Sequence, residues 1–196
     1  RVLFRSNLKE LNLSATPITD AAIAHLAKAE RLEVLRMESV RINGSGFEAF
    51  AKTKGKENTL REIHAAMTQM AIPGFRHLKS IPSLEFLDIS NIRLTDVQLN
   101  ELRGASNIST LNASNNRLSA AGMPIFATMR KLHHLDLSNM STIDDSSLAV
   151  LSKDKKLKTL NVSLTSCTPQ GLQTFAKLQK QCELLNNDKQ KKDRKS

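Results

Sequence analysis

His64, Asp88 and Ser90 are residues of the types that form hydrolytic triads, and they lie in two neighbouring segments of similar sequence. A triad requires a nucleophile on a strained turn and backbone amides directed at the oxyanion. Both segments alternate apolar and polar residues, which predicts two flat, adjacent strands. Flat strands provide neither feature. We therefore predict that His64 and Asp88 form a surface ion pair and that the protein is not an enzyme.

The residue types that bind metal ions are dispersed along the chain. His133 and His134 are adjacent, and neighbouring side chains of a strand point to opposite faces, so one metal ion cannot bind both. Cys167 and Cys182 lie far from any CxxC motif or Cys/His cluster, which argues against a zinc site and a disulfide framework. The nucleotide-binding signature G-x-x-x-x-G-K-S/T is absent. We predict no metal, no cofactor, and a cytoplasmic, intracellular protein with reduced cysteines.

The composition limits the remaining function classes. The chain has 196 residues, 40% of them hydrophobic, which suffices for one continuous core. It contains no apolar run of about 18 residues, so we expect no transmembrane segment. Seven Phe and no Trp or Tyr leave few rings for stacking on nucleic-acid bases. Because the chain begins at Arg1 and shows no signal segment, we expect a fragment or a processed chain.

A pattern of three apolar residues, LxxLxL, recurs along the whole chain, and LHHLDL at Leu132 to Leu137 shows it clearly. The copies start at Leu8, Leu32, Leu60, Leu84, Ile108, Leu132 and Leu157. Their intervals of 24, 28, 24, 24, 24 and 25 residues are typical of a solenoid. Within each copy the alternation predicts a short strand whose leucines point inward and whose intervening residues point outward.

Each predicted strand is followed by a small polar residue, an inward apolar residue and then a helix. Thr19-Asp20, Thr95-Asp96 and Asp144-Asp145 precede apolar residues spaced three and four apart. Their side-chain oxygens are placed to accept the free amides of a first helical turn, and their charge suits the positive end of the helix dipole. We predict one helix per repeat, buried on one side against the strands. The buried side of the last helix is expected to comprise Leu172, Phe175 and Leu178.

With these features the chain resembles a leucine-rich-repeat protein over residues 8 to 183. The segment Thr16-Pro17-Ile18-Thr19-Asp20, with a helix after it, resembles the intracellular ribonuclease-inhibitor-like, cysteine-containing and bacterial TxITD-type repeats. It lacks the longer Gly-Ile-Pro stretch of plant receptor repeats and the cysteine-rich caps of extracellular members. The resemblance implies an α/β fold: a curved solenoid of about seven repeats, with a parallel β-sheet on the concave face and helices on the convex face.

The expected organisation of the chain has three parts. Residues 1–7 form the exit of a preceding, truncated repeat, residues 8–185 form the leucine-rich-repeat domain, and residues 186–196 form a basic disordered tail. We expect a flexible basic loop at residues 52–58, and we expect Pro73-Gly74 to shorten the helix of the third repeat. Leu184-Leu185 is expected to add a last partial strand.

The outward residues of the strands form two columns on the concave face, where a solenoid ordinarily binds its partner. Phe86 is an aromatic residue among polar ones, a composition typical of a binding hot spot. His134 and Asp136 are expected to form a second patch next to Asp88. The predicted partner-binding residues are Arg36, Glu62, His64, Phe86, Asp88, His134 and Asp136. The alternative is that the Asn and Asp residues only form hydrogen bonds across the strands and that Phe86 is exposed incidentally.

The chain has a formal net charge of +10, and many of its basic residues lie near the expected helix ends. The predicted electrostatic rim comprises Lys52, Lys54, Lys56, Lys153, Lys155 and Lys156. In one interpretation these cations stabilise the negative ends of the helices. In the other they form a strip for RNA, an acidic protein or an anionic membrane, assisted by the basic tail.

The resemblance implies docking functions without catalysis, such as those of scaffolds, adaptors and substrate-recognition subunits. We therefore predict a non-catalytic protein-protein interaction module that binds a protein partner on its concave face and is monomeric on its own. The alternative is a basic adaptor that binds RNA, or an acidic protein or membrane surface, through the lysine-rich rim and the C-terminal tail. The scarcity of aromatic rings disfavours nucleic acid.

Overall fold

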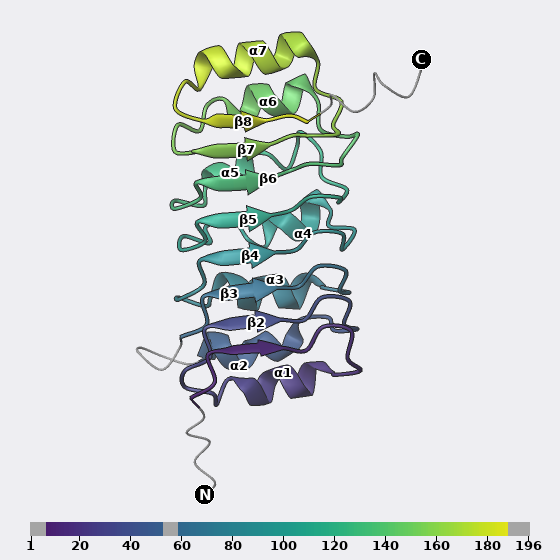
Figure 1. The fold of residues 1–196 in the computed structure, drawn as a ribbon, viewed down its shortest axis with the longest axis vertical. Coiled ribbons are helices and arrows are strands. Elements are labelled where there is room, and N and C mark those ends of the chain that lie inside the picture. The colour runs from purple at the N-terminus through teal and green to yellow at the C-terminus, as the bar shows by residue number, and fades with distance from the viewer. Residues whose placement is uncertain (1–6, 53–58, 188–196) are drawn as a thin grey trace, which may run out of the picture.

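The strands form one sheet in which their order follows the chain. The computed structural model describes residues 7–52 and 59–187. The strands in these residues are β1 (Glu10–Asn12), β2 (Val34–Arg36), β3 (Glu62–His64), β4 (Phe86–Asp88), β5 (Thr110–Asn112), β6 (His134–Asp136), β7 (Thr159–Asn161) and β8 (Glu183–Leu185). Every neighbouring pair is parallel, from β1 to β8 (Figure 1). Because each strand pairs with those of the preceding and following repeats, the chain builds a solenoid.

Short helical segments follow the first seven strands and cover one side of the sheet (Figure 1). They are α1 (Asp20–Leu26), η1 (Ser45–Phe47) with α2 (Glu48–Lys52), α3 (Ile72–Lys79), α4 (Asp96–Asn100), α5 (Pro124–Ala127), α6 (Asp145–Leu151) and α7 (Pro169–Leu178). Isolated helices of this length are unstable in water, so packing against the sheet holds them in place.

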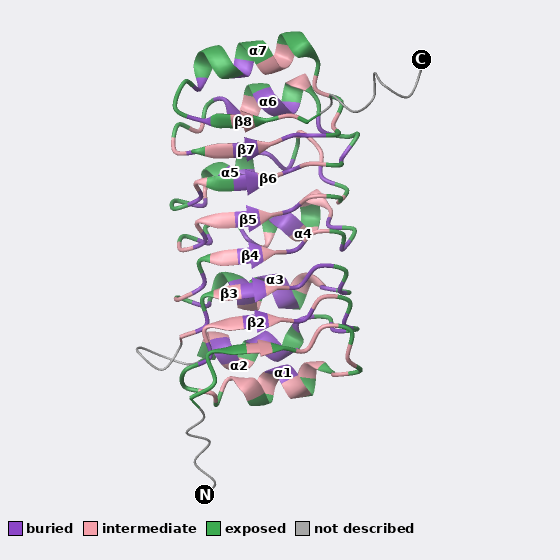
Figure 2. Cartoon of the chain, in the orientation of Figure 1, coloured by how far each residue is buried: buried purple, intermediate pink, exposed green. Residues whose placement is uncertain are grey.

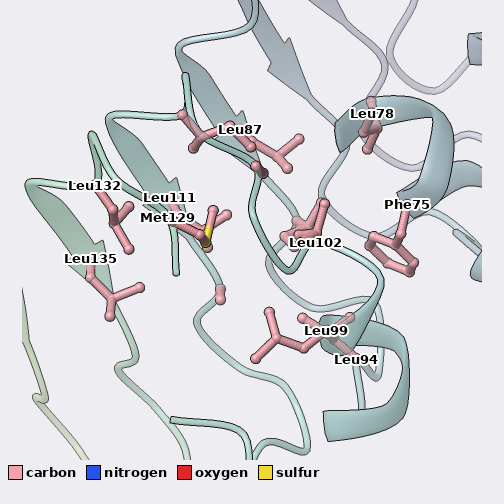
Figure 3. Close-up of a cluster of buried hydrophobic side chains, with 14 of the residues drawn as sticks. Phe75, Leu78, Leu87, Leu94, Leu99, Leu102, Leu111, Met129, Leu132 and Leu135 are labelled. Atoms are coloured by element: carbon pink, nitrogen blue, oxygen red, sulfur yellow. The ribbon is translucent and has the colours of Figure 1, made fainter. Parts of the chain in front are cut away.

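The central residues of the inner strands form an apolar row through the molecule. This row comprises Leu35, Ile63, Leu87, Leu111, Leu135 and Leu160, each at most 2% exposed (Figure 2). They belong to the same hydrophobic cluster as the helix residues Phe75 and Leu99 (Figure 3). Leu11 of β1 and Leu184 of β8 are only partly buried. The core therefore runs along the whole solenoid and is most completely buried in the middle repeats.

A residue in the left-handed region turns the chain from the sheet toward the helices in each repeat. It stands five positions after the start of each of the first seven strands. These residues are Ala15, Ser39, Met67, Asn91, Asn115, Asn139 and Leu164, with φ between 53° and 60°. Of these residue types, Asn adopts this conformation at the lowest cost. The turn is thus imposed by the repeat even where the local residue disfavours it.

Aspartates at the starts of three helices connect consecutive repeats. Asp96 accepts hydrogen bonds from the amide and the hydroxyl of Ser119 in the next repeat, at 3.0 and 2.6 Å. A Cβ atom at Gly122 would lie 2.3 Å from Oδ1 of Asp96, so the bridge also requires a glycine at that position. The equivalent bridges join Asp20 to Asn43 and Gly46, and Asp145 to Thr168 with Gly171 beside it.

These bridges correct part of the predicted helix capping. Asp144 does accept the amide of Ser147 in the first turn of α6, at 3.1 Å. Thr19 makes no side-chain cap hydrogen bond to α1, and Asp20 accepts amides of the following repeat instead. The capping prediction was wrong for Thr19, which makes no such bond, and for Asp20, Asp96 and Asp145, because the following repeat presents donors to these three carboxylates.

Two predictions about helix packing were also wrong. Pro73 and Gly74 do not shorten the third helix, because the proline occupies the first turn, where its missing N–H would be unpaired anyway, and α3 has 8 residues. Leu178, expected in the buried stripe of α7, is 53% exposed. It borders a hollow of about 250 Å³ between α6 and α7, together with Leu148 and Phe175.

The last partial strand that Leu184-Leu185 predicted is present as β8. Three predicted segments lie mostly outside the described residues: the exit of a preceding repeat (residues 1–6 of 1–7), the basic loop (53–58 of 52–58) and the basic tail (188–196 of 186–196).

Candidate functional site

The concave face carries two columns of outward side chains, in the register that the repeat length predicts. The strands pair so that Glu62 lies beside Phe86, and His64 beside Asp88. The first column comprises Glu10, Val34, Glu62, Phe86, Thr110, His134, Thr159 and Glu183. The second comprises Asn12, Arg36, His64, Asp88, Asn112, Asp136, Asn161 and Leu185. The predicted partner-binding residues therefore share one surface, the concave face.

A polar network on β1 to β3 centres on Arg36. Its Nε donates to Oε1 of Glu10 at 2.8 Å, and this hydrogen bond raises the pKa of Arg36. Its Nη1 lies 3.2 Å from Nε2 of His64. Because a guanidinium only donates, this contact is a hydrogen bond only in the tautomer that carries the ring proton on Nδ1. Nε2 of His64 also lies 3.6 Å from Oε2 of Glu62. The network fixes the orientation of the His64 ring.

The His64 ring in turn supports Phe86. The two ring centroids are 4.7 Å apart and the ring planes are tilted by 33°. The side chain of His64 is 14% exposed, and Phe86 is half-buried. A rigid aromatic surface flanked by polar groups loses little entropy when a partner packs on it. The structure thus brings together Arg36, Glu62, His64 and Phe86 from three strands.

The predicted ion pair between His64 and Asp88 is not formed. In the described residues the contacts of His64 are with Arg36, Glu62 and Phe86. Oδ1 of Asp88 accepts the amide of Ser90 at 2.9 Å instead. The backbone places His64 and Asp88 side by side, but Nε2 of His64 lies 3.2 Å from the Arg36 guanidinium.

The second predicted patch lies on β6. Nδ1 of His134 is 3.0 Å from Oγ1 of Thr159, and Asp136 accepts hydrogen bonds from the amide of Ser138 and the side chain of Asn161, both at 2.8 Å. It was predicted to adjoin Asp88, but β5 lies between β4 and β6. The prediction of adjacency was wrong because it ignored the intervening repeat.

The alternative interpretation predicted hydrogen bonds across the strands for the Asn and Asp column, and the bond from Asn161 to Asp136 is of this kind. Most of the bonds of this column are local instead. Each of these residues accepts the backbone amide two positions further on and so shapes the turn after its strand. The pairs are Asn12 with Ser14, Asp88 with Ser90, Asn112 with Ser114, Asp136 with Ser138, and Asn161 with Ser163. Asp88 and Asp136 therefore have a structural role: Oδ1 of each accepts the amide that shapes the turn. Asn112 makes the same contact in its own repeat, so an Asn can serve this role.

Two polar features of the structure were not predicted: a row of paired charges and the side chain of Asn116. Charges of alternating sign precede the first strands, where Lys9 pairs with Glu33 at 3.0 Å and Arg61 with Glu85 at 3.6 Å. The spacing of 24 residues within each pair was the available signal. The second is Asn116, whose side chain accepts the amides of two residues and donates to two carbonyls. Its partners are Ile92 and Leu94, and Ile89 and Ala113.

Three of the four lysines of the basic rim that the structure describes contact other groups of the protein. Lys52 pairs with Glu48 at 2.7 Å. Nζ of Lys155 donates to the carbonyls of Ser152 and Leu178 at 3.1 and 2.8 Å. Lys156 pairs with Asp154 and donates to the carbonyl of Phe126. Lys153 is exposed, and Lys54 and Lys56 lie outside the described residues. The contacts of Lys155 and Lys156 are those of cations at the negative ends of helices.

The described residues contain no group of three or more His, Cys, Asp or Glu side chains that could hold a metal ion. Neither Cys167 nor Cys182 forms a disulfide there. Burial raises the pKa of the Cys182 thiol to about 11, with a further contribution from the charge of Glu183. This thiol is therefore protonated and unreactive at neutral pH.

Comparison with known proteins supports the fold. No protein-family model matches the chain. Two similar solved structures are from Listeria monocytogenes strain 4b F2365. One is an internalin C2, with a TM-score of 0.61 and 18% identity over 94% of this chain and 76% of that chain. The other is an internalin (inlF), with a TM-score of 0.56 and 17% identity over 92% of this chain and 60% of that chain.

The eight-stranded parallel sheet, the helices alternating with its strands and these structural neighbours establish a leucine-rich-repeat solenoid, as predicted. The chain spans three fifths of the second neighbour's length. No helix in the described part of the chain is long and apolar enough to cross a membrane.

Proposed function

We propose that this chain is a non-catalytic protein-protein interaction module that binds a protein partner on its concave face, in a scaffold, adaptor or substrate-recognition role. The observation that carries the proposal is the half-buried Phe86 ring, supported by His64 at 4.7 Å and bordered by Glu62 and Asp88. An apolar anchor inside a polar rim is the composition of an interaction hot spot. The solenoid supports the proposal because it presents this surface on a rigid sheet.

The proposal predicts that Phe86 dominates the affinity for the partner. Truncation of a hot-spot residue costs about 2 kcal/mol, or about thirtyfold in Kd. Phe86→Ala should therefore abolish capture of a partner that the wild-type chain retains. The matched control is Val97→Ala, because Val97 is apolar, 69% exposed and located on α4, away from the concave face.

The measurement is affinity capture with the wild-type chain and both variants at equal loading, followed by quantitative mass spectrometry and a Kd for any retained protein. Loss with Phe86→Ala and retention with Val97→Ala is the expected result. Equal retention by all three proteins would reject the concave face as the binding site.

The second candidate function is a basic adaptor that binds RNA, or an acidic protein or membrane surface, through the rim and the tail. The net charge of +10 favours it. The internal contacts of Lys52, Lys155 and Lys156 oppose it, because those cations already have partners. Deletion of residues 186–196, with binding measured at low and high salt, separates the two functions. If the chain is a basic adaptor, the deletion and high salt should each weaken binding strongly. If the chain binds through its concave face, the deletion should weaken binding little.

We further propose that the chain is monomeric and cytoplasmic. The absence of a disulfide at Cys167 and Cys182 is compatible with a reducing compartment. Light scattering during size-exclusion chromatography tests the first point, and fractionation of cells that express the natural protein tests the second.

A further inference from the structure

Two strands of the concave face, β4 and β6, share the same order of outward side chains, a ring followed by a carboxylate; β3 has them in the reverse order, as Glu62 and His64. β4 reads Phe86-Leu87-Asp88 and β6 reads His134-Leu135-Asp136, so each has a ring and a carboxylate on its outward face. β5 and β7 both read Thr-Leu-Asn and lack both groups. Because neighbouring strands are about 4.8 Å apart, the two pairs are about 10 Å apart along the solenoid.

The charge of the outward strand positions is opposite in sign to that of the whole chain. The outward positions of the described strands carry the carboxylates Glu10, Glu62, Asp88, Asp136 and Glu183. Arg36 is the single Lys or Arg at these positions, and it is already paired with Glu10 at 2.8 Å. The outward strand positions therefore carry a net negative charge, in a protein whose formal net charge is +10.

The two aspartates retain acceptor capacity. Oδ1 of each aspartate is occupied by the amide of the following turn, Ser90 or Ser138. In the described residues no group donates to Oδ2 of Asp88, and Oδ2 of Asp136 accepts one hydrogen bond, from Asn161. Since a carboxylate accepts about four hydrogen bonds, both aspartates can receive a cation without losing the turn.

We propose that the concave face recognises a basic segment of its protein partner, with one Lys or Arg at Phe86 and Asp88 and a second at His134 and Asp136. This inference rests on the proposed function and specifies the chemistry of the partner. Each ring packs against the aliphatic stem of the basic side chain, and each aspartate accepts from its charged group. The Phe86 face adds attraction for a cation. The segment spans β5 between the two pairs.

A short peptide with two fixed arginines tests this spacing. Polyproline II has three residues per turn and a rise of about 3.1 Å, so residues three apart lie on one side, about 9 Å from each other. The probe is therefore the capped tetrapeptide arginine-proline-proline-arginine. The controls are glutamate-proline-proline-glutamate, which reverses the charge, and arginine-arginine-proline-proline, which has the same charge at the wrong spacing.

Binding is measured on the full chain by amide chemical-shift perturbation at low salt. We expect saturable shifts at residues 86–88 and 134–136 with the probe, weaker binding of the adjacent-arginine control and none of the glutamate peptide. Asp88→Asn and Asp136→Asn should each raise the Kd of the probe about two- to fivefold, the range for exposed ion pairs. We expect these variants to keep the fold, because Asn112 accepts the amide of the equivalent turn in its own repeat. Glu183→Gln, an outward carboxylate outside both pairs, should leave binding unchanged.

The inference is overturned if the glutamate peptide binds as well as the probe, if the adjacent-arginine control binds equally, or if both Asn variants bind the probe as the wild type does. Its failure is distinct from failure of the proposed function. If the probe does not bind but Phe86→Ala still abolishes partner capture, the concave face remains the docking site and only the basic chemistry is wrong.

Discussion

At the scale of single residues, the fold depends on side chains that satisfy the turn after each strand. The seven left-handed positions include Asn three times and Ala, Ser, Met and Leu once each. Asn enters this region at lower cost than Ala, and Gly enters it freely. The repeat therefore enforces a backbone conformation that several of its own residues oppose, which makes these positions local reservoirs of strain.

Asn91 provides a test of this account, because it is exposed, has φ of 55° and its backbone amide is bonded to the carbonyl of Ser114. Asn91→Ala should lower the free energy of unfolding by about 1 kcal/mol, and Asn91→Gly should cost much less. Urea denaturation measures both changes. Equal losses for Ala and Gly would show that the Asn side chain, and not the backbone conformation, is what matters.

At the scale of elements, the helix starts serve two purposes. Some acidic residues cap their own helix, as Asp144 does for α6, and others connect one repeat to the next, as Asp96 does with Ser119. Hydrogen bonds from the Ser146 hydroxyl, then from the Ser147 amide, lower the pKa of Asp144 below its ordinary value of 3.8. The short helices thus gain stability from groups at their ends as well as from packing.

The lowered pKa makes the contribution of Asp144 depend on pH. The unfolded chain binds a proton on this residue more readily than the folded chain, so its stabilisation is fully present above pH 3.8 and declines as the pH falls through the lower folded value. Asp144→Ala should cost about 1 kcal/mol at pH 7. This difference from the wild type should shrink in urea titrations below pH 3.8. A constant difference down to pH 2 would contradict the charged-cap explanation.

At the scale of the whole molecule, the solenoid joins its repeats only through neighbours. Leu111 in β5 is 1% exposed and has repeats on both sides, whereas Leu11 in β1 is half-buried at the end of the described sheet. Burial of the central row therefore couples the middle repeats more strongly than the end repeats.

This difference predicts unequal effects of the same substitution. Leu111→Ala should lower the free energy of unfolding by about 3 kcal/mol, since it leaves a cavity in a closed core. Leu11→Ala should cost about 1 kcal/mol, since less apolar surface is buried there. Urea denaturation gives both values, and hydrogen exchange should show the strongest protection in β4 to β6. Equal losses would mean that the stack is uniformly cooperative.

The backbone placement of the candidate site was predictable, but most of its contacts were not. The repeat length fixes which residues lie side by side, so the pairing of Glu62 with Phe86 and of His64 with Asp88 followed from counting. The contact between Arg36 and His64 did not, because it depends on how a long side chain is directed once Glu10 binds it. The same limit explains the wrong ion pair for His64 and the missed hydrogen bonds of Asn116.

By itself, the sequence determined the solenoid, its inward leucines and the two outward columns, because a period repeated at near-constant length leaves one register that buries the apolar row. The tertiary structure alone decided which charges are already paired. It directs Asp20, Asp96 and Asp145 into the next repeat and Lys155 and Lys156 onto helix carbonyls. These partners lie 23 to 30 residues away along the chain, and only stacking of the repeats brings them within hydrogen-bonding distance.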